Sequence, residues 1–249
     1  MNKFVKRIIT HSKKEDKSGK FLKNGLVEII LVKVGILLAL AIYGFYLDHV
    51  EQKKIEEYFI SIHQEIEPAI KKGEEKNKQI NTLIVKVTNC LNIINAKNID
   101  SLKYLKDNLG PLVSVNSQTI SFPAAKELSN NSYISKVKNK ETVNLLRKMQ
   151  QQLIVINEKH KFNTNRYLLT VEPFTNVFFN YSEIALPKQK EFLIDGGPAT
   201  DYDKVFNNMV LWNLLSQKLE GYKSHLHRQK EFIILLKALN TNLKNQIDN

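Results

Sequence analysis

Six histidines are the residues best suited to metal or acid–base chemistry: His11, His49, His63, His160, His225 and His227. His63 precedes Glu67 by four residues, and the His225-x-His227 pair lies near Glu231, so each set shares one side of a helix. Neither the His-Glu-x-x-His pattern of helical zinc sites nor a paired Glu-x-x-His pattern occurs. The spacing favours solvated helical histidines, and we predict no metal site.

Nucleophiles and phosphate loops give no stronger signal. The single cysteine, Cys90, stands beside Leu91 in an apolar helical stripe, where a small buried side chain is expected. No glycine-rich dinucleotide or P-loop motif is present, and Gly196-Gly197 is too short to cradle a phosphate. We therefore predict no catalytic residue, no cofactor and no enzymatic activity; an enzyme with an unfamiliar site is a third alternative to the two functional hypotheses given below.

The positive charge of the chain is concentrated at its start. The sequence has 37 Lys and Arg against 25 Asp and Glu, a net charge of +12. Residues 1–25 account for +6 of it, and the rest is interleaved with acidic residues, unlike the focused basic face of a nucleic-acid-binding protein. We predict no nucleic-acid partner. The residues expected to orient the chain against anionic lipid are Lys3, Lys6, Arg7, Lys13, Lys14, Lys17, Lys20 and Lys23.

A long apolar run follows this basic tail. Residues 29–47 contain one charge, Lys33, and as a helix they would span roughly 28 Å, close to the hydrocarbon thickness of a bilayer. Tyr43, Phe45 and Tyr46 gather at the end away from the cations, as at a membrane interface. The pattern predicts a transmembrane helix over 26–47 that crosses a membrane once, with a cytoplasmic N-terminus and the remainder outside the cytoplasm. The family resemblance described below implies that this membrane is the bacterial inner membrane and that the remainder is periplasmic.

Two other interpretations of the run stay open. A buried core helix can be equally apolar, and Ala39-Leu40-Ala41 has the small-x-small form of a signal-peptide cleavage site. Apolar residues continue for six positions beyond Ala41, which favours an uncleaved anchor. Gly35 and Ala39 form a small-xxx-small pair, a candidate packing motif for helices within the membrane.

The helices beyond the anchor must position any functional side chain. Apolar residues recur at steps of three and four over 48–94, and again from Asp201 or Asp203 almost to the end of the chain. We expect a kink near Pro68 and a weak point at Gly73. Two amphipathic helices of similar length are expected to pair lengthwise, so the predicted fold is all-α: a transmembrane helix followed by an elongated extramembrane bundle built on two long antiparallel helices.

The middle of the chain adds shorter segments. With only 9 Gly and 6 Pro, the composition favours helices over a turn-rich β-sandwich or barrel. Helices are expected over 99–109, 121–128, 139–157 and 172–181, with a loop at 195–198. No repeat or low-complexity linker divides this part. The predicted domains are therefore a basic cytoplasmic tail (1–25), a transmembrane helix (26–47) and one extracytoplasmic helical domain (48–249).

The apolar helix also resembles a known family. Residues 25–40, Gly-Leu-Val-Glu-Ile-Ile-Leu-Val-Lys-Val-Gly-Ile-Leu-Leu-Ala-Leu, are similar to the opening of a family of uncharacterised bacterial single-pass membrane proteins, a domain of unknown function. Phe122, Leu128, Ser129, Ile134 and the Lys-Asn-Lys-Glu at 138–141 match a second pattern of that family. Lys33 stands where an apolar residue is usual. The resemblance implies a single-pass, mostly helical envelope protein and implies no activity.

These features lead to two principal functional hypotheses. The first is a membrane-anchored helical scaffold or protein-interaction module, with the lipid bilayer and another envelope protein, or a second copy, as partners. The second is a small-molecule sensor that signals through a partner protein. Its candidate pocket residues are Tyr167, Phe174, Phe178, Phe179 and Trp212.

Overall fold

The structure is a computed structural model that describes residues 16–96, 99–115 and 120–248 of the chain. Within these ranges every regular element is a helix, which confirms the all-helical prediction. The chain divides into two compact units, Met1–Lys54 and Ile55–Asn249, and helix α2 (Asp16–Ala96) contributes to both. Of the lipid-orienting cations, Lys17, Lys20 and Lys23 lie on α2. The other five lie outside the described residues: Lys3, Lys6, Arg7, Lys13 and Lys14.

The first unit contains the apolar run as part of α2. An 18-residue window of this helix has a mean hydropathy of 2.5, and none of it is buried by other described residues. The helix is therefore long and apolar enough to cross a membrane, and it lacks the burial expected of a core helix in a water-soluble protein. Gly35 and Ala39 are among its exposed residues.

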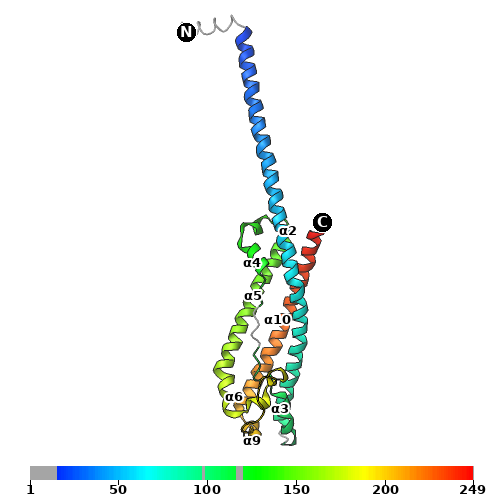
Figure 1. The fold of residues 1–249 in the computed structure, drawn as a ribbon, viewed down its shortest axis with the longest axis vertical. Coiled ribbons are helices and arrows are strands. Elements are labelled where there is room, and N and C mark those ends of the chain that lie inside the picture. The colour runs from blue at the N-terminus through cyan, green and yellow to red at the C-terminus, as the bar shows by residue number, and fades with distance from the viewer. Residues whose placement is uncertain (1–15, 97–98, 116–119, 249) are drawn as a thin grey trace. The chain divides into compact units, whose positions relative to one another are not determined.

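The second unit is a bundle in which three long helices are joined by short ones (Figure 1). The long helices are the 55–96 part of α2, α5 (Lys140–Arg166) and α10 (Met209–Ile247). Four short elements lie between α2 and α5: η1 (Ile99–Tyr104), α3 (Leu105–Asn108), α4 (Pro123–Asn130) and η2 (Ser132–Lys136). Five lie between α5 and α10: η3 (Tyr167–Val171), α6 (Glu172–Phe178), α7 (Tyr181–Ile184), α8 (Pro187–Lys190) and α9 (Tyr202–Phe206).

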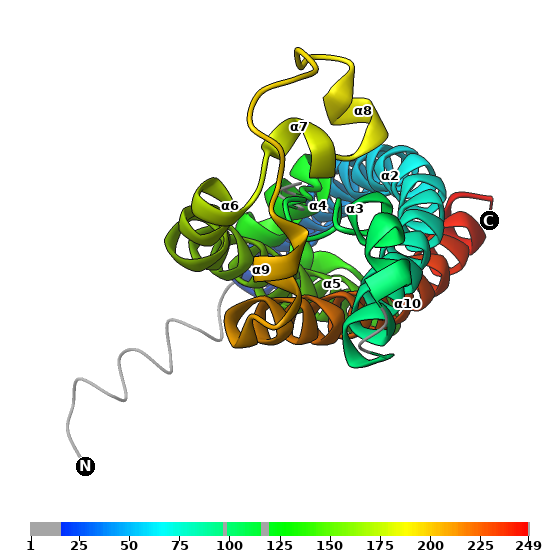
Figure 2. The same cartoon turned by 90° about the horizontal axis from the view of Figure 1, so that it is seen from below.

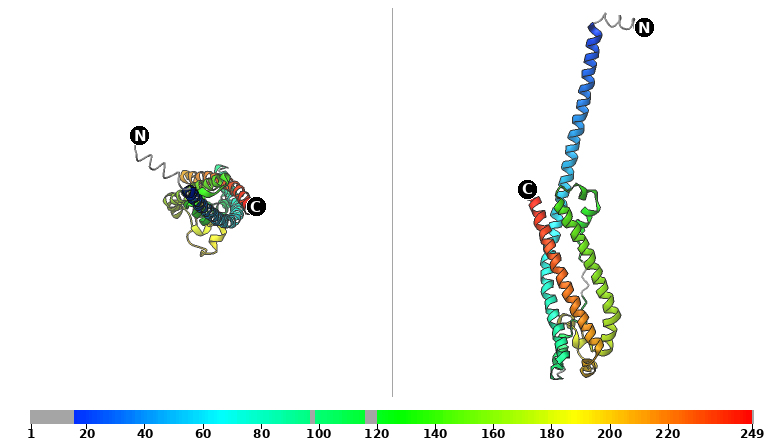
Figure 3. Two further views of the ribbon diagram at one scale, coloured as in Figure 1. Left: turned by 90° about the horizontal axis from the view of Figure 1, so that it is seen from above. Right: turned by 180° about the vertical axis from the view of Figure 1, so that it is seen from behind.

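Helix α10 lies beside both other long helices (Figure 3). Toward α2, the His63 ring nitrogen Nδ1 is 2.7 Å from Asn240 Oδ1, and Gln229 Nε2 donates to the Gly73 carbonyl at 3.3 Å. Toward α5, the Thr142 hydroxyl donates to Asn242 Oδ1 at 2.5 Å. Polar side chains thus fix the register of helices that are distant in sequence.

Two separate apolar clusters form the core of the bundle. One contains Ile55, Ile66, Leu146 and Phe232 among its buried residues, together with α4 side chains. The other is formed where α3, α6 and α9 pack on α2 and the first half of α10. Helices α2 and α10 contribute to both clusters, because their apolar residues recur at helical spacing along the bundle, whereas α5 contributes only to the cluster that contains Leu146.

The helix boundaries depart from the expected ones at two places. Helix α2 continues without interruption through Pro68 and Gly73. The expected single helix from Asp201 onward is divided: α9 ends at Phe206, and α10 begins after Asn208, whose Oδ1 accepts from the Val210 and Leu211 amides. A side-chain cap supplies acceptors for amides that a new helix leaves unpaired, so it stabilises a fresh start.

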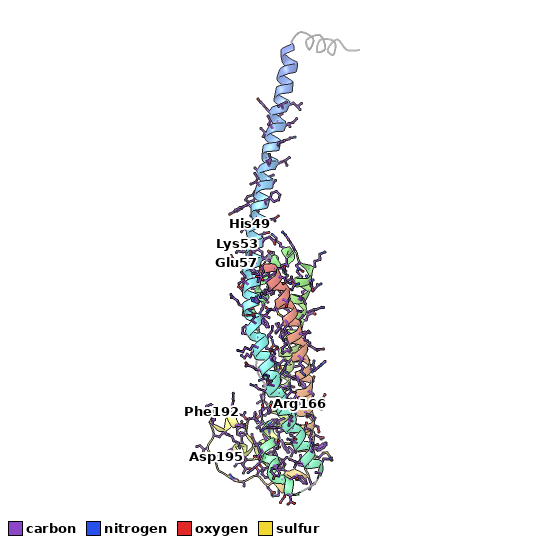
Figure 4. The ribbon with its side chains drawn as sticks, turned by 90° about the vertical axis from the view of Figure 1, so that its right-hand side faces the viewer. His49, Lys53, Glu57, Arg166, Phe192 and Asp195 are labelled. Atoms are coloured by element: carbon purple, nitrogen blue, oxygen red, sulfur yellow. The ribbon has the colours of Figure 1, made fainter. Side chains whose placement is uncertain are left out.

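An arm stands away from the long helices on one side of the bundle and consists of α7, α8 and the following loop (Figure 2). Its base is fixed by Asn180 Nδ2, which donates to the carbonyls of Gly196 at 2.9 Å and Pro198 at 3.0 Å. Gly196 has a φ of 118°, a backbone conformation that favours glycine. Phe192 and Asp195 lie on this arm (Figure 4).

Candidate functional site

A polar layer separates the two apolar clusters of the bundle. On α10 it extends from Gln217 to Gln229, past Tyr222 of one cluster and up to three residues before Phe232 of the other, and on α5 and η3 it extends from Ile156 to Val171. Helix α2 contributes Lys76 at the same level. Burying polar side chains costs free energy unless they find partners, so a polar layer inside a helical core is a candidate functional site.

Two adjoining cavities occupy this layer. The larger has a volume of about 160 Å³, and the smaller, about 70 Å³, extends from it toward η3. His160, Asn163, Arg166, Gln217, Gly221 and His225 line both. A single water needs only about 10–15 Å³ measured in this way, so the larger cavity has space for a small organic molecule.

Helical spacing explains how the lining is assembled. His160, Asn163 and Tyr167 are three or four residues apart on α5 and η3, and so are Lys218, Gly221 and His225 on α10. Residues at this spacing share one face, so two helices that pack along these faces direct both sets into the space between them. Gly221 contributes no side chain, and an added Cβ there would meet no atom within 4 Å. The glycine therefore helps to leave the cavity open.

A π-helical segment, η3, forms one end of the site. The backbone changes from α-helix to π-helix after Arg166, and both Tyr167 and Val171 of this segment line the smaller cavity. The Thr170 hydroxyl donates to the Arg166 carbonyl at 2.6 Å within the wider turns. Single π-helical turns within α-helices frequently occur at functional sites, because they redirect side chains that a regular helix would place elsewhere.

Lys218 is the most enclosed cation of the site. Its ammonium donates to the Ser114 carbonyl at 2.6 Å and lies 5.5 Å from the centre of the Tyr167 ring. Burial, followed by repulsion from Arg166, lowers the pKa of Lys218 to about 8. Tyr222 beside it donates its hydroxyl to the Pro111 carbonyl, and burial raises its pKa to about 12. Lys218 is thus held as a charged group in an environment that solvates it poorly.

Two imidazoles that line both cavities contact each other. The rings of His160 on α5 and His225 on α10 are 5.2 Å apart, centre to centre, in an edge-to-face arrangement. Burial, and then the positive potential of His160 and Lys76, lowers the pKa of His225 to about 4. His225 is therefore neutral at pH 7, when it presents one N–H donor and one acceptor nitrogen.

The described lining of the two cavities is strongly unbalanced in charge. It contains five basic residues, Lys76, Lys159, Arg166, Lys218 and Arg228, against one acidic residue, Glu220. Within the described parts of the chain, no carboxylate lies at ion-pairing distance from any of the five. Burial also lowers the pKa of Lys76. Chemically, the layer offers guanidinium, ammonium and imidazole donors to a negatively charged group.

The expected aromatic pocket is placed differently. Of its five residues, Tyr167 lines the smaller cavity, whereas Phe174 and Phe179 are buried in the neighbouring apolar cluster. Phe178 is exposed and stacks on Phe174 at 4.7 Å, and Trp212 is half-buried on α10. The structure thus places one of the five, Tyr167, at the cavity. Phe174, Phe178 and Phe179 instead contact one another on α6 and directly after it.

The remaining chemistry-bearing residues lie apart from this layer. His63 is 3.9 Å from Glu67 and faces Asn240 of α10, whereas His227 is 3.4 Å from Glu231 on the exposed side of α10. Cys90 is fully buried, and burial raises its pKa to about 12. In the part of the chain that the structure describes, no three His, Cys, Asp or Glu side chains are grouped as metal ligands.

Sequence reasoning named His160 and His225 without connecting them, and it assigned no role to Lys218. The 64 residues between the two histidines carry no spacing signal, because the approach of the two rings depends on how α5 packs against α10. One signal was available: basic or histidine residues replace apolar ones at helical spacing on both helices. No known family, curated protein or solved structure matches the chain.

Proposed function

We propose that this chain is a single-pass membrane protein whose extramembrane bundle serves as a scaffold or protein-interaction module. The observation that carries the proposal is an apolar helix that nothing in the described chain covers, joined to a unit with its own apolar clusters. Uncovered apolar surface of this length is stable in hydrocarbon rather than in water. The bilayer is then the first partner of the protein.

The proposed bundle is elongated and extracytoplasmic, and it rests on two long antiparallel helices, α2 and α10, with α5 beside them. The contacts of His63 with Asn240 and of Gly73 with Gln229 support the opposite directions of α2 and α10. In this proposal the basic tail faces the cytoplasm and residues 48–249 face the periplasm, as the distribution of Lys and Arg favours.

The arm and the neighbouring helix ends support the interaction role. Phe192 and Ile194 on the arm, Val177 on α6 and Met209 at the start of α10 are all large exposed apolar residues. Phe192 and Ile194 are two residues apart on the arm, and exposed apolar side chains that lie together mark sites of protein association. A partner in the envelope, or a second copy of the chain, would cover them.

Orientation is tested by labelling cysteines from outside the cell. Buried Cys90 is replaced by Ala, and one new cysteine is placed in the arm (Asp195→Cys) or in the basic tail (Ser18→Cys). An impermeant maleimide added to spheroplasts should label the arm and leave the tail unlabelled until the membrane is opened. The reverse pattern would contradict the orientation, and recovery of the protein without detergent would contradict the anchor.

The interaction role is tested by photo-crosslinking in native membranes. A photoreactive residue at Phe192 should give a discrete adduct, whereas the same residue at Ile234, exposed on α10, should not. Equal labelling from both positions, or none from Phe192, would contradict a partner on the arm.

A second candidate function, ligand sensing, is favoured by one observation only, the cationic cavity between α5 and α10.

A further inference from the structure

We propose that the polar layer of the bundle is a binding site for a small organic oxyanion, a molecule that bears a carboxylate or phosphate group. The site consists of Arg166 and His160 from α5, Lys218 and His225 from α10, and Lys76 from α2. It is independent of the scaffold function and would give the sensor alternative the chemical class of its ligand.

The charge of the cavity lining favours an anionic ligand. Five basic side chains line connected cavities with a single acidic one, and none of the five has a described carboxylate partner. Cations that lose hydration without gaining a counter-ion raise the free energy of the folded state. An oxyanion bound among them replaces the missing counter-charge, so its binding is coupled to relief of that cost.

The arrangement of the donor side chains also suits an oxyanion. The donors come from three helices and line two adjoining cavities, so a single ligand there can contact several of them. Arg166 lines both cavities, and a guanidinium donates two parallel hydrogen bonds to a carboxylate or phosphate. The Tyr167 and Tyr222 rings flank Lys218 at 5.5 Å and 5.9 Å and restrict where its ammonium can move.

The cavities beside Gly221 have room for a ligand. Gly221 faces both cavities, and its neighbours leave room for a Cβ. A bundle that needed only stability would fill the polar layer with apolar side chains, as it does in the two apolar clusters on either side. A cavity left open between charged groups therefore points to an occupant rather than to a packing fault.

Binding should be visible in the protonation of His225. The ring is surrounded by His160 and Arg166 on α5, Lys76 on α2, and Lys218, Glu220 and Arg228 on α10. An anion in this space offsets the positive potential and favours the imidazolium form, so bound anion and bound proton stabilise each other. Anion affinity is then expected to rise as the pH falls from 7 to 5.

The experiment is an NMR titration of the full chain in nanodiscs of zwitterionic lipid. The imidazole signal of His225 is identified as the one missing from the His225→Asn variant. Its pKa is measured with sulfate, which keeps its double charge over this pH range, and with chloride at equal ionic strength. Sulfate should raise the His225 pKa by about one unit, and the shift should saturate with concentration. An unchanged pKa, or an equal effect of chloride, would overturn the proposal.

Matched variants separate binding from folding. Arg166→Gln should weaken sulfate binding about tenfold or more, the effect of one lost charged hydrogen bond, while Arg147→Gln, exposed on the same helix, should not. Gly221→Leu should block binding by filling the cavity without removing a charge. Circular dichroism verifies that each variant is folded. Wild-type affinity in both Arg166→Gln and Gly221→Leu would exclude this location.

Two sources of oxyanion are distinguished by the lipid. If nanodiscs that contain an anionic phospholipid raise the His225 pKa without sulfate, the ligand is a lipid headgroup. If only sulfate raises it, the ligand is a soluble molecule. Either result supports the site, and neither depends on the crosslinking from the arm, so failure here and failure of the scaffold proposal are separate outcomes.

Discussion

The His225 imidazole loses much of its hydration on folding and faces His160 and Lys76, which together lower its pKa from 6.5 to about 4. Between these pH values the unfolded chain binds a proton that the folded chain does not. The free energy of unfolding therefore keeps its full value above pH 6.5 and falls as the pH is lowered toward 4. The loss due to His225 is about 3 kcal/mol at most, and less where water reaches the ring.

His225→Gln should remove this part of the pH dependence. Chemical denaturation of the detergent-solubilised chain at intervals from pH 4 to 8 measures it. His49→Gln is the matched control, because His49 is exposed on α2 and its replacement should leave the slope unchanged. If both variants lost stability with pH as the wild type does, the folded bundle would not be holding His225 in its neutral form.

Gly73 and Gly221 give opposite predictions for the same substitution, although both lie inside long helices. Alanine in place of a helical glycine typically stabilises by about 0.5–1 kcal/mol. At Gly221 the new Cβ meets nothing within 4 Å, so Gly221→Ala should be more stable than wild type. At Gly73 it would approach Ile233 Cδ1 to 3.1 Å, and Ile233 is buried, so Gly73→Ala should lose that gain. Thermal unfolding of the two variants compares them directly; a higher midpoint for Gly73→Ala would contradict the packing.

At the scale of the element, the start of α10 depends on one side chain. Asn208 Oδ1 accepts from the Val210 amide at 2.8 Å and from the Leu211 amide at 3.3 Å. Asn208→Ala should destabilise the bundle by about 1 kcal/mol, because two amides lose their acceptor. Asn207→Ala, the exposed neighbour, should change stability by a few tenths of that amount. Denaturant titration of both variants measures the difference, and equal losses would show that the cap is not what stabilises the helix start.

The same element shows where sequence reasoning succeeded and where it stopped. Helices were predictable from apolar residues at steps of three and four, as at Leu215, Leu219 and Tyr222, because amphipathic periodicity is local. The break at Asn207-Asn208 was not, since apolar periodicity continues across it from Val205 to Leu211 and the cap forms only after the chain turns. Pro68 does not end the helix: α2 continues through it at an exposed position.

The candidate site was less predictable than the helices. His160 and His225 meet because α5 and α10 pack with a particular register, and that register follows from contacts such as Thr142 with Asn242 at the other end of both helices. Of the pocket residues expected from the sequence, Tyr167 lines the smaller cavity, at the start of the π-helical segment. Tertiary packing, rather than any spacing in the sequence, brings together the cations of the polar layer.

At the scale of the whole molecule, the exposed apolar residues of the proposed membrane helix contact lipid, whereas those of the bundle contact water. Leu38 and Leu40 are 57% and 62% exposed in the first unit, within a continuous apolar run. Val85 and Ile154 are 57% and 59% exposed in the bundle, surrounded by polar neighbours. The two pairs have similar exposed fractions and differ in that only Leu38 and Leu40 are proposed to lie within a membrane. Arginine in the centre of a spanning helix costs about 2.5–3.5 kcal/mol, whereas on a wet surface it costs almost nothing.

The double variant Leu38→Arg/Leu40→Arg should therefore lose membrane insertion, since the two charges oppose it by about 5–7 kcal/mol in total. Val85→Arg/Ile154→Arg, with the same added charge and matched exposure, should remain in the membrane. Alkaline carbonate extraction followed by sedimentation measures the inserted fraction of each. If the first variant stayed with the membrane as fully as the second, the apolar run would not be the anchor and the bundle itself would hold the protein there. If both were released, added charge rather than position would be responsible.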